Sequence, residues 1–150
     1  IFAYGVNIIE KKMSEYAPLV LNEIRPDIIV LTGHDSYNQK GLLDLKNYNN
    51  SENFMNTIRK IRSIRPSLDC CVIAGACQSN FEALIAAGAN FASSPQRINI
   101  HTYDPAVVAI KVATTSFLKL VSFLDMLKYI KGGRGAFGGV ETLGKMKLLL

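Results

Sequence analysis

Apolar positions along this chain follow two different periods. Apolar residues recur at helical spacing over residues 8–23 and again over residues 51–63, where Ser51 begins the segment as a helix cap. Residues 28–32 form a β-branched run without alternation, which is typical of a strand buried on both faces. The apolar residues 1–6 also favour a strand. The first third of the chain is therefore expected to form a strand, a helix, a second strand and a second helix.

The same alternation continues through the middle of the chain. Residues 70–73 predict a third strand, residues 79–87 a helix that Gly88 terminates, and residues 91–93 a fourth strand. Strands that alternate with helices indicate an α/β fold in which helices cover both faces of a mostly parallel sheet. The sequence therefore predicts three layers, α/β/α, within a single domain over residues 1–150.

The last third of the chain has a less regular pattern. Residues 105–112 are apolar at a period that fits either a strand or a helix, whereas residues 116–130 favour a helix. The glycine-rich residues 132–139 predict a loop or hairpin, and residues 140–150 a final strand or a tail. Residues 36–50 predict a polar loop, and loops of this length in compact domains are often functional.

Composition narrows the class of protein. Of the 150 residues, 49% are hydrophobic and 19% charged, as in an ordinary soluble globular domain. The formal net charge of +5 comes from basic residues scattered among carboxylates, so no nucleic-acid partner is expected. No apolar run reaches the ~20 residues of a membrane helix, so no membrane partner is expected either.

Three cysteines occur without any paired metal-binding spacing. Cys70 and Cys71 are adjacent, and neighbouring residues on a strand point to opposite faces, so they are poorly placed to bridge each other. We therefore expect a reduced compartment, and neither a metal nor another cofactor.

Two reactive side chains follow the predicted strands. His34 comes just after strand 28–32, and Cys77 comes just after the third strand. Because chemistry in open α/β sheets occurs beyond the carboxyl ends of the strands, both side chains are expected to reach one crevice. A cysteine with a histidine is the minimum equipment for covalent acyl transfer. We therefore expect Cys77 to be a nucleophile and His34 its general acid and base.

The backbone around these residues also suits acyl transfer. The helix expected at residues 79–87 would present its positive end to Cys77 and favour the thiolate. Gly33 and Gly75 permit tight turns, and the amides of Cys77 and Asp35 could donate to an oxyanion.

Other roles stay open for the same residues. Cys77 also fits a buried packing position, while Cys70 and Cys71 lie in the predicted strand and are assigned to the core. Asp35 fits either an orienting partner of an imidazole or a residue that caps the turn. His101 is a competing histidine that is expected to be structural or exposed.

Two other functions are compatible with this pattern. The segment Gly75-Ala-Cys-Gln-Ser79 loosely resembles a nucleophile elbow, which would fit an amidotransferase-like hydrolase with His101 as the available histidine. A non-catalytic flavodoxin-like module could instead bind a ligand or peptide at the Gly33 and Gly75 loops, although the chain has no glycine-rich phosphate motif.

Several blocks of residues carry a family resemblance. They are Arg25-Pro-Asp-Ile-Ile-Val-Leu-Thr-Gly-His-Asp-Ser-Tyr37, the run from Ala74 to Pro95, Arg97-Ile-Asn-Ile-His101 with Asp104-Pro105, and Gly138-Gly-Val-Glu-Thr142. They closely resemble the YabG family of sporulation peptidases over most of the chain. The resemblance implies a cysteine endopeptidase that processes spore-coat and related spore proteins, cuts next to arginine and can process itself.

The same resemblance implies where the protein works and what surrounds this chain. It implies a cytoplasmic protein of the sporulating cell that is associated with the developing spore coat. It also implies an additional N-terminal region of comparable size, which agrees with a chain that opens at Ile1 without methionine.

The order of strands and site residues also resembles the caspase-like peptidases, in which one strand ends in histidine and another in Ala-Cys. That resemblance implies a caspase-like sheet. Many of those enzymes have glycine directly after the histidine, whereas here Asp35 follows His34 and Gly33 precedes it. The part of the residue 35 amide in an oxyanion hole therefore stays open.

An arginine preference requires a carboxylate that can pair with the guanidinium. Asp104 is the first candidate because it follows a segment expected to be a strand near the crevice, and Glu82 and Asp35 are alternatives. Asp104 before Pro105 also fits a plain turn. Ser94 is a further candidate for contact with the substrate.

Overall fold

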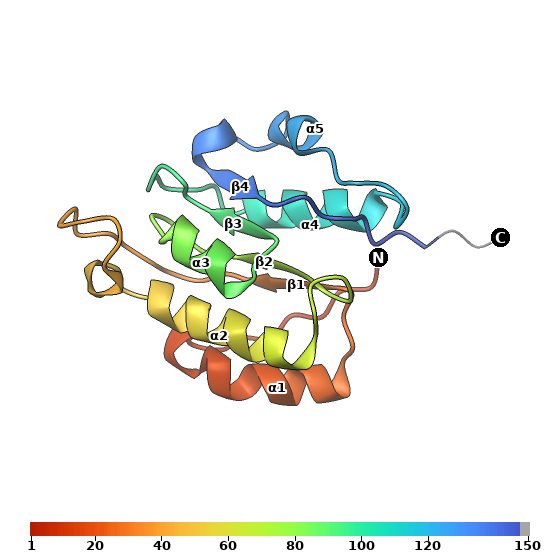
Figure 1. Ribbon diagram of the computed structural model, residues 1–150, viewed down its shortest axis with the longest axis horizontal. Coiled ribbons are helices and arrows are strands. Elements are labelled where there is room, and N and C mark those ends of the chain that lie inside the picture. Colours follow the sequence, from red (N-terminus) through yellow and green to blue (C-terminus); the bar gives the residue numbers. More distant parts are fainter. Residues whose placement is uncertain (148–150) are drawn as a thin grey trace.

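The computed structural model describes residues 1–147 and shows a mixed α/β fold (Figure 1). The strands are β1 (Ile28–Leu31), β2 (Cys71–Ala74), β3 (Phe91–Ser93) and β4 (Phe137–Gly139). The helices are α1 (Met13–Glu23), α2 (Ser51–Ile64), α3 (Phe81–Ala87), α4 (Asp104–Thr114) and α5 (Phe123–Leu127). Three short 3₁₀ turns are η1 (Glu10–Lys12), η2 (Leu45–Asn47) and η3 (Gly133–Gly135).

The four strands form one sheet in the order β1-β2-β3-β4. β1, β2 and β3 run parallel to one another, and β4 is antiparallel to β3. Leu31 at the end of β1 is directly opposite Ala74 at the end of β2. The prediction of a mostly parallel sheet between helical layers is therefore confirmed.

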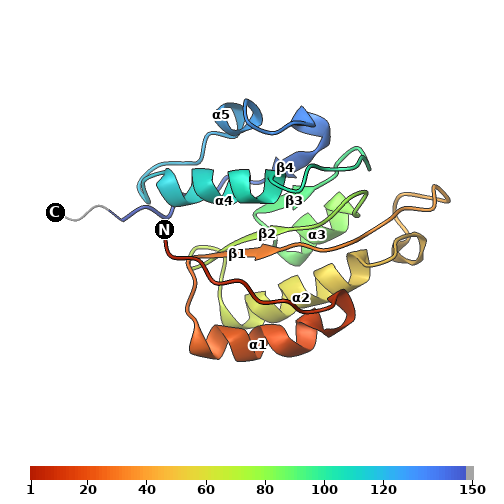
Figure 2. The ribbon, with the colours of Figure 1, turned by 180° about the vertical axis from the view of Figure 1, so that it is seen from behind.

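Two apolar clusters cover the two faces of the sheet. Val72 and Ala74 of β2 belong to the cluster formed with α1, α2 and α3, whereas Cys71 and Ile73 belong to the cluster formed with α4 and α5. Successive residues of a strand point to opposite faces, and all four are buried, which explains why this strand shows no polar alternation. Figure 2 shows α4 and α5 on the side of the sheet opposite to α1 and α2.

Two predicted elements differ from the structure. Residues 1–6 form no strand within the described sheet, and Ile1 is 89% exposed, because a strand requires a hydrogen-bonded partner that this segment does not have there. The helix predicted over residues 116–130 is wrong in its first half, since only Phe123–Leu127 is helical. Residues 116 and 120 instead form isolated bridges with Met146 and Leu143.

The segments that the sequence left open are now assigned. Residues 105–112 belong to α4, with Pro105 near its first turn, where a missing amide hydrogen costs nothing. Part of the glycine-rich segment forms β4, because its bare Cα atoms leave room for the rings of Phe81 and Phe91. The predicted final strand or tail at 140–150 contains bridges but no strand up to residue 147, and residues 148–150 lie outside the described chain.

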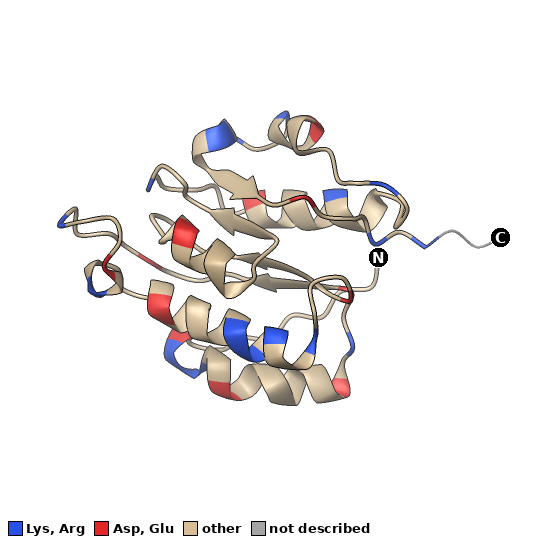
Figure 3. Cartoon of the chain, in the orientation of Figure 1, with Lys and Arg blue, Asp and Glu red and all other residues tan. Residues whose placement is uncertain are grey.

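Acidic and basic residues both occur on the face that carries α1, α2 and α3 (Figure 3). Lys12 pairs with Glu15, and Arg65 with Asp69, so part of the basic charge is balanced locally. Among residues 1–147, no helix is both long and apolar enough to span a bilayer.

Candidate functional site

The loops that follow β1, β2 and β3 leave the same end of the sheet (Figures 1 and 2). The ladder continues one residue past the strands, where the Gly75 N–H donates to the Leu31 carbonyl at 3.0 Å. His34 and Cys77 each lie three residues beyond the paired positions Leu31 and Ala74. The Tyr37 N–H donates to Gln78 Oε1 at 3.1 Å and ties the two loops together. The carboxyl edge of the sheet therefore brings the cysteine loop beside the histidine loop.

Cys77 lies half-buried in a sharp turn. Gly75 at φ 117° and Gln78 at φ 58° both adopt positive φ angles, which reverse the chain before α3. The helix begins at Phe81, later than predicted, so its N-terminus is four residues from the cysteine. The Cys77 Sγ instead accepts a hydrogen bond from the Ile100 N–H at 3.4 Å. The backbone of a distant segment, and not the N-terminus of α3, therefore contacts the sulfur.

Three buried serine hydroxyls hold this turn. Ser79 Oγ accepts from the Ala76 N–H at 3.0 Å, and Ser93 Oγ donates to the Ala76 carbonyl at 2.7 Å. Ser94 Oγ accepts from the Gln78 N–H at 3.0 Å. A Cβ on Gly75 would collide with Ser93 Oγ, so only glycine fits there. Ser94, which the sequence offered for substrate contact, is fully buried under the turn.

His34 projects into solvent from the loop after β1. Its side chain is 97% exposed, and its carbonyl accepts from Asn50 Nδ2 at 2.8 Å. Within residues 1–147, the imidazole makes no hydrogen bond to Cys77. Catalytic hydrogen bonds are often long in unliganded proteins and tighten around the substrate, so this geometry is compatible with a dyad.

Glu10 is the acidic partner of His34, and no sequence pattern predicts this pairing. Its Oε1 accepts from the His34 N–H at 2.7 Å and lies 3.5 Å from the imidazole Nδ1. The hydrogen bond from the His34 backbone lowers the pKa of Glu10, so its carboxylate stays ionised at neutral pH. Glu10 lies in η1, 24 residues before His34, which is too far for a local motif.

Asp35 has a structural position within the loop. Its buried carboxylate accepts from the Ser36 and Asn50 N–H groups at 2.9 and 2.7 Å and from Ser51 Oγ. Ser51 Oγ in turn accepts from the Asn80 N–H at 2.8 Å, which links the start of α2 to the cap of α3. Of the two open roles for Asp35, the contacts favour anchoring of the turn, while Glu10 is the carboxylate beside the imidazole.

His101 also lies close to the cysteine, because it follows Ile100. Its Nδ1 accepts from the Tyr103 N–H at 3.2 Å, and its ring lies 5.3 Å from that of Tyr103. The nitrogen is thus engaged by local backbone, as expected for a structural histidine. Its neighbouring position nevertheless makes it the natural control for His34.

The three carboxylates considered for an arginine pocket already have partners. Asp104 is 1% exposed and accepts from the His101 and Lys131 N–H groups at 3.3 and 3.4 Å. Asp104 also begins α4, and the segment before it is irregular, so the expectation that it follows a strand is wrong. The exposed Glu82 pairs with Arg97. Of the three, only Glu82 keeps an accessible carboxylate, because Asp35 is buried as well.

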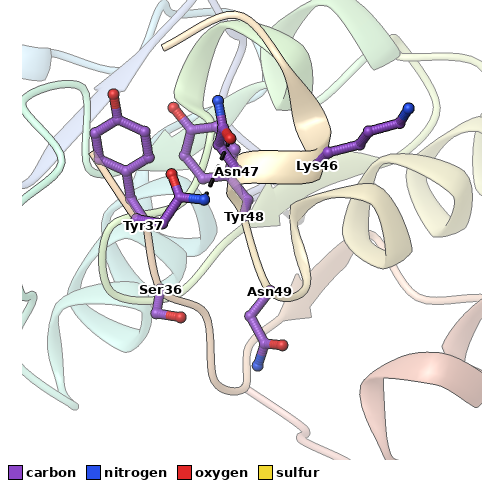
Figure 4. A pocket seen from close by; sticks show the side chains of 7 residues that line it. Ser36, Tyr37, Lys46, Asn47, Tyr48 and Asn49 are labelled. Atoms are coloured by element: carbon purple, nitrogen blue, oxygen red, sulfur yellow. Dashed lines mark hydrogen bonds between the residues drawn. The ribbon is translucent and has the colours of Figure 1, made fainter. Parts of the chain in front are cut away.

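A small hollow lies beside the histidine loop (Figure 4). Its volume is about 260 Å³, and it is lined by Ser36, Tyr37, Asn38, Lys46, Asn47, Tyr48 and Asn49. The Tyr37 and Tyr48 rings stack with centroids 4.9 Å apart, and Arg97 lies over the second ring. The hollow has a lysine and no carboxylate, so it is poorly suited to a guanidinium group.

The other two cysteines lie in the core. Cys70 and Cys71 are fully buried, and desolvation raises the pKa of the Cys71 thiol to about 12 and raises the pKa of Cys70 as well. Both thiols are therefore protonated and unreactive near neutral pH. In the described part of the chain, no group of three or more His, Cys, Asp or Glu residues is arranged to hold a metal ion.

The fold and site together define an α/β protein with a cysteine loop and a histidine loop at the carboxyl edge of a parallel sheet. The model of a family described as YabG peptidase U57 matches residues 1–150, and the chain belongs to that family. The family resemblance read from the sequence is confirmed.

A curated relative agrees with this assignment. The chain is 44% identical over 148 residues to the sporulation-specific protease YabG of Bacillus subtilis (strain 168). The alignment covers 97% of this chain and 51% of the relative, so the chain spans about half the length of that protein. No solved structure matches the chain.

Proposed function

We propose that this chain carries the active site of a cysteine peptidase of the sporulating cell, with Cys77 as nucleophile and His34 as general acid and base. The observation that carries the proposal is the placement of both loops at one carboxyl edge, joined by the hydrogen bond between Tyr37 and Gln78. The family assignment and the name of the Bacillus relative support a protease. In this proposal the cysteine and histidine have the roles that covalent acyl transfer requires.

The reaction begins when the Cys77 thiolate attacks the carbonyl carbon of the scissile peptide bond. The carbonyl electron pair moves onto oxygen, where the Cys77 and Asp35 N–H groups are the candidate donors, since neither has a partner within residues 1–147. The His34 N–H is already committed to Glu10. Protonated His34 then donates its proton to the departing amine as the C–N bond breaks. The neutral imidazole next takes a proton from the water that attacks the thioester, and the C–S bond breaks to release the acid and the Cys77 thiolate.

The substrates we infer are spore-coat and related spore proteins cleaved next to arginine, and self-processing of the same polypeptide follows from the same specificity. The protein would act in the cytoplasm of the sporulating cell and associate with the developing spore coat. Among the carboxylates of the site, Glu82 is the one that could share its charge with an incoming guanidinium, because it is exposed while Asp104 and Asp35 are buried.

Selective alkylation tests the nucleophile. One equivalent of iodoacetamide at pH 8 should modify Cys77, as mapped by peptide mass spectrometry, and abolish cleavage of an arginyl peptide in parallel. Cys70 and Cys71 should stay unmodified because both are buried and have raised pKa values. Full modification of Cys77 with retained cleavage would overturn its assignment as nucleophile.

Substitution of Glu82 tests the arginine pocket. Glu82→Gln should lower kcat/KM for an arginyl peptide about two- to fivefold, because an exposed charge pair contributes at most about 1 kcal/mol. The same peptide with citrulline, which has a similar shape without the charge, should be cleaved slowly and equally by both proteins. Equal losses on both peptides would mean that Glu82 acts only through its pair with Arg97.

A further inference from the structure

We propose that Glu10 is a positioning residue for His34, which extends the proposed Cys-His site to a third, carboxylate member. The inference rests on the proposed function, since it assigns Glu10 a role through the histidine of that site. Glu10 lies in η1, which precedes β1 in the chain and is not one of the loops that follow the strands.

One carboxylate oxygen contacts His34 twice. Glu10 Oε1 accepts from the His34 backbone N–H at 2.7 Å, which is a short charge-assisted hydrogen bond, and lies 3.5 Å from the imidazole Nδ1. The first contact holds the backbone from which the ring projects. The second places the negative charge on the Nδ1 side of the ring, so that Nε2 faces away from Glu10.

Gly33, the residue before His34, leaves space for Glu10 to approach the His34 backbone. A Cβ at position 33 would collide with Glu10 Oε1 and crowd its Cδ and Cγ atoms at 3.1 Å. Gly33 has no positive φ angle, so its backbone conformation does not demand glycine. Glycine at this position therefore lets Glu10 come this close to the His34 backbone without a shift of its side chain.

His34 is the ionisable partner of Glu10 within residues 1–147. The Glu10 side chain is only 19% exposed, while Lys12, two residues further on, is paired with Glu15 at 3.0 Å. Within residues 1–147, Glu10 forms no ion pair with a lysine or arginine. A carboxylate without another cation is free to stabilise the imidazolium that forms when the thiol gives up its proton.

The consequence is a defined tautomer and ring orientation. An ionised carboxylate only accepts hydrogen bonds, so it favours the tautomer with hydrogen on Nδ1 and leaves the lone pair on Nε2 for proton transfer. An imidazole that is almost fully exposed has no packing to restrict it. Glu10 is therefore the group that can limit the ring to the productive orientation.

The positioning role of Glu10 can be tested by steady-state kinetics of a Glu10→Gln variant of the complete natural polypeptide. Glutamine keeps an oxygen that can accept from the His34 N–H but removes the charge. We expect kcat for an arginyl peptide to fall about 10- to 100-fold with KM changed less than about twofold, as for other partners that orient a histidine. Glu15→Gln, which removes a nearby surface carboxylate, should leave both constants unchanged.

A spectroscopic measurement separates positioning from folding. Long-range ¹⁵N–¹H correlation spectra of ¹⁵N-histidine protein report which ring nitrogen carries hydrogen, and the two histidines of the chain can be assigned with a His101→Gln variant. Neutral His34 should show the Nδ1–H pattern in wild type and lose it in Glu10→Gln. Unchanged kcat in Glu10→Gln, or an unchanged ¹⁵N pattern, would overturn the proposal.

Cleavage by a Cys77→Ala variant and the ¹⁵N pattern of His34 separate the role of Glu10 from the proposed peptidase function. If Cys77→Ala cleaved peptides at the wild-type rate, the peptidase assignment of Cys77 would fail. The ¹⁵N pattern of His34 would still show whether Glu10 sets the tautomer, because it is read without turnover.

Discussion

Replacement of Cys77 by alanine should reduce kcat for peptide cleavage by about 10⁴-fold or more, with little change in stability. The substitution removes the sulfur that would form the thioester, and no other thiol can replace it. Cys70 and Cys71 are buried in or beside β2. The serine hydrogen bonds that hold the turn involve the backbone of Ala76 and Gln78, so alanine at position 77 preserves them. Initial rates on an arginyl peptide and a urea unfolding curve measure the two effects.

Two histidine variants complete this test. His34→Ala should lower kcat by a comparable factor, whereas His101→Ala should change it less than about threefold, because His101 Nδ1 is engaged by the Tyr103 N–H. The opposite ranking would transfer the acid and base role to His101. Wild-type cleavage by Cys77→Ala would contradict the whole assignment.

Replacement of Arg62 by alanine should destabilise the fold by about 2–4 kcal/mol. This half-buried arginine of α2 donates to the Gly88 and Cys70 carbonyls at 2.8 and 2.9 Å and to Asn90 Oδ1 at 2.7 Å. It thereby joins the end of α2, the start of β2 and the turn before β3. Removal of the guanidinium leaves the Gly88 and Cys70 carbonyls without this donor, while Asn90 Oδ1 still accepts from the Val72 N–H.

Arg59→Ala is the matched control on the same helix. Arg59 is exposed, so its removal should change the free energy of unfolding by less than about 0.5 kcal/mol. Arg62→Lys should fall between the two, because an ammonium group cannot reach three separate acceptors from one position. Urea midpoints at an unchanged m value give the comparison. Equal midpoints for the two alanine variants would show that the arginine contacts contribute nothing net.

Helices and strands could be predicted where period and chain breakers agree. The residues of α2 repeat at helical spacing and stop before Pro66, and the helix ends at Ile64. β2 lacks alternation because both of its faces are covered. The helical period of residues 116–130 does not produce a continuous helix, because apolar residues in an irregular segment can satisfy that period by chance. There, bridges to residues 143 and 146 compete with the helix.

The candidate site could be predicted only in outline. The parallel order of β1 and β2 puts the loops of His34 and Cys77 at one edge, which follows from chain order and right-handed crossovers. The burial of Asp104 and its local backbone partners could not be predicted, since neither can be read from a short motif. The pairing of Glu82 with Arg97 could not be predicted from the sequence for the same reason.

The sequence by itself determined the α/β class, the parallel order and the family, because these depend on periodicity and on long matched blocks of residues. Only the tertiary structure decided which groups surround the Cys77 sulfur and the His34 side chain. Glu10 reaches His34 across 24 residues, and the Ile100 N–H reaches the Cys77 sulfur across 23. Such contacts depend on how separate turns fold over the edge of the sheet, and nothing in the local sequence of either partner encodes them.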